Sequence, residues 1–144
     1  MDDVRIRTAG PEDAAGLARL MEHLGYPTTP AQMAARLEPI LPDPDYRTLV
    51  AEAGGALVGM VGVFRGRDYS RDAPYARVLA LVVDPARRGS GVGAALMAAA
   101  EAWAREAGAG SVHLTTAAHR EGAHRFYERL GYEGGGLRYR KPLG

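Results

Sequence analysis

RRGSGVGAAL, residues 87–96, is the stretch of sequence that decides the fold. It follows an apolar run, VLALVV (78–83), and the pair Asp84-Pro85, and its three glycines stand on alternate positions before small and apolar residues. A strand, a glycine-rich turn and a helix in this order form a recurrent anion site, because the first helical amides have no internal partner and the helix dipole favours negative charge. A Cβ on the glycines would hold a phosphate away. The stretch therefore predicts a ligand that carries phosphate.

Two common phosphate loops do not fit these residues. Gly89, Gly91 and Ala94 satisfy a loose G-x-G-x-x-A pattern, but a dinucleotide fold usually carries that loop after its first strand, with an acidic residue about 20 positions later. Here the loop lies in the second half of the chain, and the next strand-like run, SVHLTTA (111–117), ends without an acid. A nucleoside-triphosphate loop ends in G-K-[ST], whereas Gly93 precedes an alanine. A glycine-rich surface turn with solvated arginines is the alternative without a ligand.

Composition predicts one domain over residues 1–144, because this length suffices for one core and no linker or repeat divides it. The formal net charge of +1 gives no reason to expect a nucleic acid or a membrane as partner. Cysteine is absent, and the four histidines show no three-ligand pattern, so no metal is expected. The start MDDVRIRT lacks the features of a secretory signal, and no apolar run is long enough to span a membrane. We therefore expect a cytoplasmic protein.

Hydrophobic periodicity predicts the order β-α-α-β-β-β-α-β-α-β-β, an α/β (α+β) fold with a mixed, mostly antiparallel sheet of about seven strands and four helices. Thr29, Pro30 and Gln32 form a capping box that opens the second helix, and Gly54-Gly55 predicts the tight turn of a hairpin. The expected strands are 4–7, 46–53, 56–64, 75–83 and 111–116, with a closing hairpin in 131–143; the expected helices are 11–25, one from 29 that Pro39 and Pro42 close, 91–107, and a short one that ends at 131.

Two segments resemble the hallmarks of one enzyme family. Arg88 to Gly93 matches R/Q-x-x-G-x-G/A, directly after a strand that ends in Asp-Pro, and AHRFYERLGY (123–132) resembles A-x-x-F-Y-x-x-x-G-F/Y. These are the hallmarks of the GCN5-related N-acetyltransferases, the GNAT family, and the element order resembles that family from Val4 to Leu143. Two hallmarks in order, about 30 residues apart, are more specific than either alone.

The resemblance implies an acyltransferase that moves the acetyl group of acetyl-CoA, its co-substrate, directly to a primary amine, more specifically an amine of a small molecule. It assigns the coenzyme pyrophosphate to the backbone amides of 88–94 and the pantetheine arm to the backbone at the end of the strand 75–83. The coenzyme-binding residues that it implies are Leu81, Val82, Val83, Arg88, Gly89, Ser90, Gly91, Val92, Gly93, Ala94, Arg120 and Ala123.

Tyr127 aligns with the family tyrosine that protonates the departing coenzyme thiolate, so the resemblance makes it the catalytic general acid. The purely structural alternative is a core stripe, because Ala123, Phe126, Tyr127 and Leu130 fall at i, i+3, i+4 and i+7. We favour the catalytic role for Tyr127.

Two departures from the family pattern leave questions open. The glutamate that many relatives carry on the strand before the loop is absent, and Arg77 and Ala80 stand in its place. The amine must nevertheless lose a proton before it attacks. Arg120 replaces the usual asparagine, and the form HR-x-x-AH-x-FY (119–127) resembles relatives that modify small amines such as aminoalkylphosphonates. The unranked candidates for the proton acceptor are Glu22, Asp72, Tyr75 and His113.

Two other functions stay open at this stage. One is a protein or peptide amino-group acetyltransferase. The other is a sensor module that binds acetyl-CoA without catalysis, which the missing glutamate favours. The resemblance also leaves a homodimer open, since relatives often dimerise.

Overall fold

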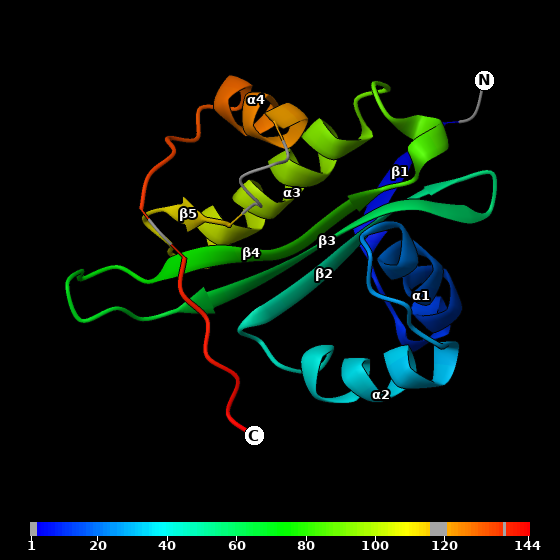
Figure 1. Cartoon of the computed structure of the whole chain (residues 1–144), viewed down its shortest axis with the longest axis horizontal. Helices are drawn as coiled ribbons and strands as arrows, with labels where there is room; N and C mark the ends of the chain where they lie inside the picture. Colours follow the sequence, from blue (N-terminus) through cyan, green and yellow to red (C-terminus); the bar gives the residue numbers. More distant parts are fainter. Residues whose placement is uncertain (1–2, 116–120, 137) are drawn as a thin grey trace. The chain divides into compact units, whose positions relative to one another are not determined.

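The computed structural model describes residues 3–115, 121–136 and 138–144, and the chain forms two compact units, 1–113 and 114–144. The first nine strands and helices follow the predicted order (Figure 1). The elements of the first unit are β1 (Arg5–Thr8), a 3₁₀ helix (Pro11–Asp13), α1 (Ala14–His23), α2 (Pro30–Ile40), β2 (Tyr46–Ala53), β3 (Ala56–Gly66), β4 (Tyr75–Val83), a second 3₁₀ helix (Pro85–Arg87), α3 (Val92–Glu106) and β5 (Val112–His113).

The sheet runs β1-β2-β3-β4-β5, with antiparallel neighbours except for the parallel pair β4 and β5. The β2–β3 hairpin turns at Gly54 and Gly55, whose φ values of 59° and 78° are both positive, as a tight hairpin turn requires. Thr29 and Gln32 cap α2 reciprocally. The backbone amide of Gln32 donates to Thr29 Oγ1 at 3.1 Å, and the backbone amide of Thr29 donates to Gln32 Oε1 at 2.9 Å. The predicted hairpin and capping box are confirmed.

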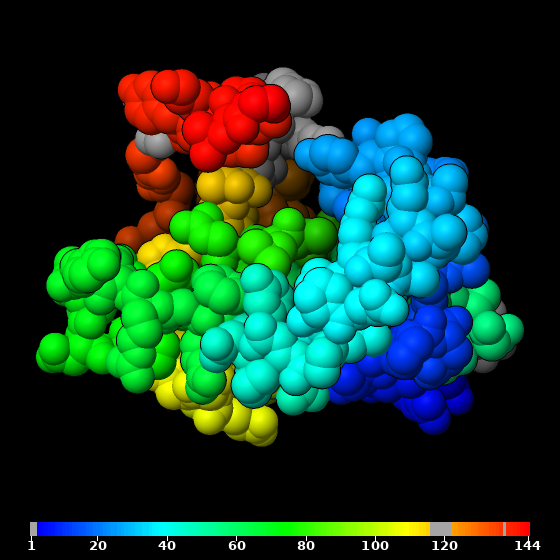
Figure 2. Space-filling view, turned by 90° about the horizontal axis from the view of Figure 1, so that it is seen from below, coloured from blue at the N-terminus to red at the C-terminus, as the bar shows by residue number. Residues whose placement is uncertain are grey.

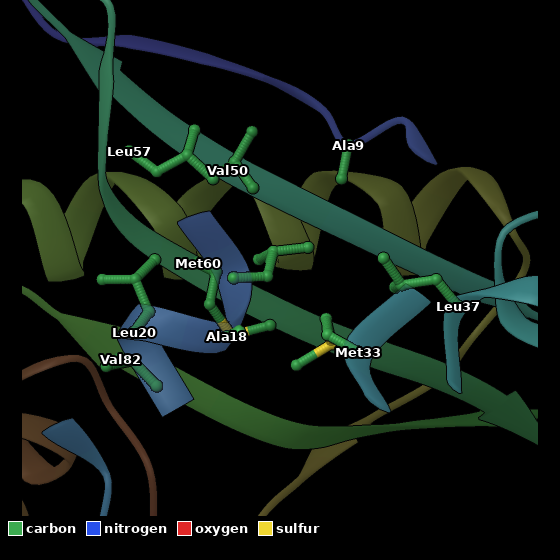
Figure 3. Close-up of a cluster of buried hydrophobic side chains, with 10 residues drawn as sticks. Ala9, Ala18, Leu20, Met33, Leu37, Val50, Leu57, Met60 and Val82 are labelled. Atoms are coloured by element: carbon green, nitrogen blue, oxygen red, sulfur yellow. The ribbon is translucent and has the colours of Figure 1, made fainter. Parts of the chain in front are cut away.

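A cluster of buried hydrophobic side chains lies between the sheet and the pair α1 and α2 (Figure 3). Val50, Met60 and Val82 are partners across β2, β3 and β4, and all three are buried. Leu20 of α1 and Met33 of α2 pack against them. In the space-filling view, α2 (cyan) lies beside α1 (blue), while the loop between β3 and β4 (green) lies at the other end of this unit (Figure 2).

Helix α3 packs on the opposite face of the sheet, at Gly59 of β3. A Cβ at Gly59 would stand 2.9 Å from Leu96 Cδ1 and 3.1 Å from Val92 Cγ1, too close for either side chain to stay where it is. Gly59 precedes Met60 in β3, and adjacent strand residues face opposite sides of a sheet. The missing side chain at Gly59 therefore sets how closely the start of α3 approaches the sheet.

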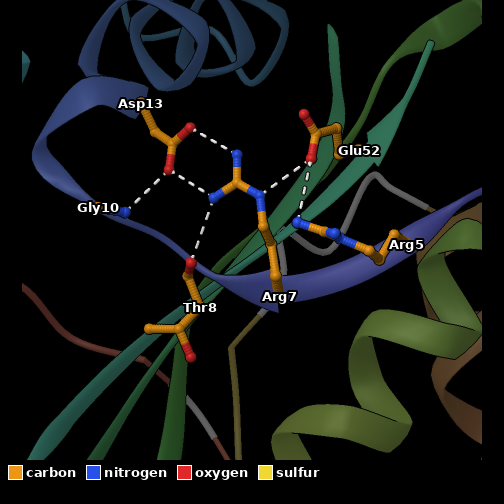
Figure 4. Close-up of polar contacts among 6 residues, drawn as sticks. All are labelled: Arg5, Arg7, Thr8, Gly10, Asp13 and Glu52. Atoms are coloured by element: carbon orange, nitrogen blue, oxygen red, sulfur yellow. Dashed lines mark hydrogen bonds and ion pairs between the residues drawn. The ribbon is translucent and has the colours of Figure 1, made fainter. Parts of the chain in front are cut away.

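A charged network joins β1, the first 3₁₀ helix and β2 (Figure 4). Arg7 donates two hydrogen bonds to the Asp13 carboxylate, both at 2.9 Å, and its Nε donates to Glu52 Oε1 at 3.0 Å. The backbone amide of Gly10 donates to Asp13 Oδ2 at 2.8 Å. The hydrogen bonds from Arg7 hold the pKa of Asp13 below its usual range, against the effect of its burial. The carboxylate of Asp13 thus ties the start of the first helical segment to the sheet.

The second unit contains α4 (Glu121–Arg129), which ends before Gly131 with φ 92°, as predicted. The prediction of a closing hairpin is wrong: residues 130–136 and 138–144 form no strand, and the described sheet has five strands rather than about seven. Three consecutive glycines, 134–136, offer no side chain to pack on a pleated surface, and Leu143 is almost fully exposed. The fifth strand is also shorter than expected, with two residues.

Within the described part of the chain, no helix has the length and apolar character needed to cross a membrane.

Candidate active site

The glycine-rich turn forms the connection from β4 to α3. Asp84 opens it by accepting a hydrogen bond from the Ala86 amide at 3.0 Å, and this bond lowers the pKa of the Asp84 carboxyl more than its contact with Arg19 does. Gly89 and Gly91 have φ values of 80° and 91°, in the left-handed region where side chains other than glycine are strained. Gly91 is also the N-cap of α3. Gly89 and Gly91 therefore allow the backbone to turn from β4 into α3 without strain.

The start of α3 exposes backbone rather than side chains. The first hydrogen bond of the helix runs from the Ala95 amide to the Gly91 carbonyl at 3.0 Å, so the amides before Ala95 have no acceptor inside the helix. Val92 is buried, and only its amide is suited to a ligand. Gly93 and Ala94 are half-buried. The other coenzyme residues predicted here, Arg88, Gly89, Ser90 and Gly91, are exposed, and their roles stay predictions.

Among the residues that the structure describes, β4 and β5 pair at two positions, Ala76 with Val112 and Arg77 with His113. Beyond Arg77, β4 continues to Val83 with β3 as its partner. The side chain of Val82 belongs to the core, as expected, while Leu81 and Val83 are half-buried. This arrangement is compatible with a pantetheine arm along the backbone of Leu81, Val82 and Val83. That contact stays a prediction.

An irregularity in β4 was not predicted. Gly62 pairs with Ala80 and Val63 pairs with Val78, so Leu79 is an extra residue without a partner on β3. Its side chain is 54% exposed. Such bulges redirect side chains and occur often beside active sites. No single residue type in the sequence marks this bulge.

Polar side chains gather where β4 and β5 begin. Arg71 Nη1 lies 2.7 Å from His113 Nε2 and 2.9 Å from Ser111 Oγ, and Ser111 Oγ lies 2.8 Å from His113 Nε2. The Tyr75 ring meets the His113 ring edge to face, with centroids 5.7 Å apart. Of the four candidate proton acceptors, the structure brings Tyr75 and His113 together. Sequence reasoning did not predict that Arg71 and Ser111 meet His113, because neither residue lies in a hallmark and Arg71 is about 40 positions away.

Tyr127 lies on α4 in the second unit and packs among aromatic rings. The centroid of its ring is 5.1 Å from that of Phe126 and 6.0 Å from that of Tyr132, both in edge-on geometry. Its side chain is half-buried, as is that of Ala123 on the same helix. Arg120 lies outside the described residues. The acid role of Tyr127 and the coenzyme roles of Ala123 and Arg120 stay predictions.

Among the residues that the structure describes, no three His, Asp or Glu side chains come together as metal ligands.

Comparison with known proteins identifies the class to which this fold and turn belong. An aminoglycoside N-acetyltransferase solved in complex with CoA superposes with a TM-score of 0.88 at 22% identity, over 99% of this chain and 97% of that one. The model of the acetyltransferase (GNAT) family matches residues 16–132. The chain belongs to the GNAT family, which confirms the predicted family and the mixed α/β fold. It confirms at the same level the predicted enzyme class, an N-acetyltransferase that uses acetyl-CoA.

Two characterised relatives act on amines, as their names state. The chain is 37% identical over 101 residues to the aminoalkylphosphonate N-acetyltransferase of Salmonella typhimurium, a match that covers 70% of this chain and 66% of the relative. It is 33% identical over 132 residues to the type 1 aminoglycoside N(6′)-acetyltransferase of Stenotrophomonas maltophilia, a match that covers 89% of this chain and 85% of the relative.

Proposed function

We propose that this protein transfers the acetyl group of acetyl-CoA directly to a primary amine of a small molecule. The observation that carries the proposal is the glycine turn at the start of α3, reached from a strand whose pairing with β5, within the described residues, covers two positions near its start. A helix start that exposes backbone amides suits a pyrophosphate, and the edge of β4 beyond its described pairs with β5 suits an amide-containing arm. Both relatives that we compared are named for small-molecule amines, which favours a small acceptor over a peptide.

In the proposed reaction, the helix amides and Arg88 hold the pyrophosphate, and the backbone of β4 orients the pantetheine arm. The amine nitrogen attacks the thioester carbon, so that a C–N bond forms and the C–S bond breaks. Tyr127 gives its phenolic proton to the departing thiolate, while the proton of the substrate ammonium passes to another group or to water. The chain has no cysteine, so an acyl-cysteine intermediate cannot form and direct transfer is the simpler route.

The test is CoA release from acetyl-CoA with a panel of amines: aminoalkylphosphonates, polyamines, aminoglycosides and peptides with free amino termini. We expect turnover of at least one small amine and none of the peptides. Turnover of peptides alone would replace the small-molecule proposal with a protein acetyltransferase. Thermal protection by acetyl-CoA without turnover of any amine would favour the sensor module.

Arg88→Ala is expected to raise KM for acetyl-CoA about fivefold, equal to ~1 kcal/mol, because one exposed charge near the pyrophosphate is lost. The value of kcat should change little. Steady-state kinetics at saturating amine measure both parameters. Arg105→Ala is the matched control, since Arg105 is an exposed arginine in the last turn of α3. An unchanged KM in Arg88→Ala would show that this side chain only shields the turn.

A further inference from the structure

The cluster of Arg71, Ser111 and His113 has a defined protonation pattern. Arginine only donates hydrogen bonds, so the N–H of Arg71 that points at His113 Nε2 requires a lone pair on this nitrogen. Neutral His113 therefore carries its proton on Nδ1. Burial lowers the pKa of His113, and the charges of Arg71 and Arg77 lower it further. The imidazole is consequently neutral at pH 7.

The charges that face His113 favour an anion. Arg71 reaches it from the loop between β3 and β4, and Arg77 is its partner on β4. Asp68 on the same loop opposes them, and its carboxylate accepts a hydrogen bond from the Ser70 amide at 3.3 Å. Two positive charges against one negative charge would repel an ammonium group. With its Nε2 lone pair also engaged by Arg71, His113 is poorly placed to take a proton from the attacking amine.

The cluster lies at the opposite end of β4 from the glycine turn (Figure 1). At about 3.3 Å per residue, the six steps from Arg77 to Val83 span roughly 20 Å, so the cluster and the coenzyme pyrophosphate occupy different places. A pantetheine arm that enters beside Val83 and passes Leu81 would bring its thioester towards the Leu79 bulge. From Arg77 to Leu79 the distance along the strand is about 7 Å. A short acceptor molecule could therefore place its oxyanion at the cluster and its amine at the thioester.

We propose that Arg71, Ser111 and His113 bind the phosphonate or phosphate group of an acceptor whose amine is separated from it by a short carbon chain. The proposal rests on the proposed function and names its substrate class. On binding, the N–H groups of Arg71 and the hydroxyl of Ser111 turn from His113 to the ligand oxygens. His113 then takes up a proton from solvent on Nε2 and donates a third, charge-assisted hydrogen bond.

The first test compares 2-aminoethylphosphonate and phosphoethanolamine with propylamine, which lacks the oxyanion. Arg71→Gln is expected to lower kcat/KM for the two anionic acceptors about tenfold to hundredfold, as the loss of a charged hydrogen bond would. It should leave propylamine unaffected. Arg71→Lys should recover part of the loss, because it keeps the charge without the planar fork. Arg47→Gln is the control: Arg47 lies on β2, and its guanidinium donates to Thr8 Oγ1. Equal losses for all three amines, or no loss for the anionic pair, would overturn the proposal.

The second test separates this proposal from the proposed function, since it needs no turnover. Methylphosphonate is added to the full chain, and the pKa of His113 is followed by NMR, with His113→Gln to assign the signal. The pKa should rise on addition, because a bound anion favours the imidazolium form, and Ser111→Ala should weaken the apparent affinity. The absence of any rise would overturn the oxyanion site even if amines are acetylated. A rise without acetylation of any amine would support the site and count against the proposed function.

Discussion

Tyr127→Phe is expected to lower kcat by roughly 10² to 10⁴-fold, the range typical of a lost general acid. The thiolate of coenzyme A would then leave without a proton from the protein, while the rest of the Tyr127 side chain would still fill its place beside Phe126 and Tyr132. The value of KM for acetyl-CoA should stay within about twofold, because the phenolic proton is required in the transition state and not for binding. Steady-state CoA release with an accepted amine measures both effects.

Tyr139→Phe is the matched control for this variant, because Tyr139 lies in the same unit and its side chain is 86% exposed. It should retain full turnover. Circular dichroism and the melting temperature establish that both variants are folded. Full turnover in a folded Tyr127→Phe protein would make Tyr127 part of a core stripe, the alternative that its helical spacing also allows.

Asp13→Ala is expected to lower the free energy of unfolding by about 3 kcal/mol, since it removes two charged hydrogen bonds from Arg7, which keeps Glu52 as its other carboxylate partner, and takes the acceptor of the Gly10 amide away. Asp13 is 7% exposed and accepts both hydrogen bonds from Arg7 as well as the one from the Gly10 amide. A loss of this size should reduce the melting temperature by roughly 10 °C in a domain of this length. Urea denaturation and calorimetry measure the two quantities.

Glu12→Gln is the control, because Glu12 is the neighbouring acid and its side chain is exposed. Its effect should stay below about 0.5 kcal/mol, as for most surface substitutions. If Asp13→Ala and Glu12→Gln were equally stable, the contacts of Asp13 with Arg7 would not contribute to stability.

The pH dependence of stability should report the same carboxylate. Its folded pKa lies below its unfolded value of about 3.9, so the stabilisation is complete above that value. It is lost as the pH falls through the lower folded pKa. Asp13→Asn should therefore differ most from the unchanged protein at neutral pH, and the difference should shrink below about pH 4. A difference that does not vary with pH would assign the effect to packing instead.

Local signals predicted much of the first unit. Gly54-Gly55 specified a hairpin because a tight turn needs positive φ at both positions, which glycine adopts without strain. Thr29 and Gln32 specified a helix start because their side chains accept hydrogen bonds from two backbone amides that have no partner inside the helix. The prediction of a closing hairpin in 131–143 was wrong, since the residues around the three glycines 134–136 do not supply side chains that hold two strands together. The bulge at Leu79 had no local signal, because it depends on how β4 pairs with β3.

The sequence by itself determined the family and the place of the glycine-rich turn, because R-G-S-G-V-G after an apolar strand needs only neighbouring residues to form such a turn. Only the tertiary structure decided that Arg71 meets Ser111 and His113, residues 40 and 42 positions later. These side chains meet because β5 joins the sheet parallel to β4, after α3 has carried the chain back to the start of that strand. Contacts made by such a crossover depend on strand order and register, and the spacing of residues along the chain does not contain them.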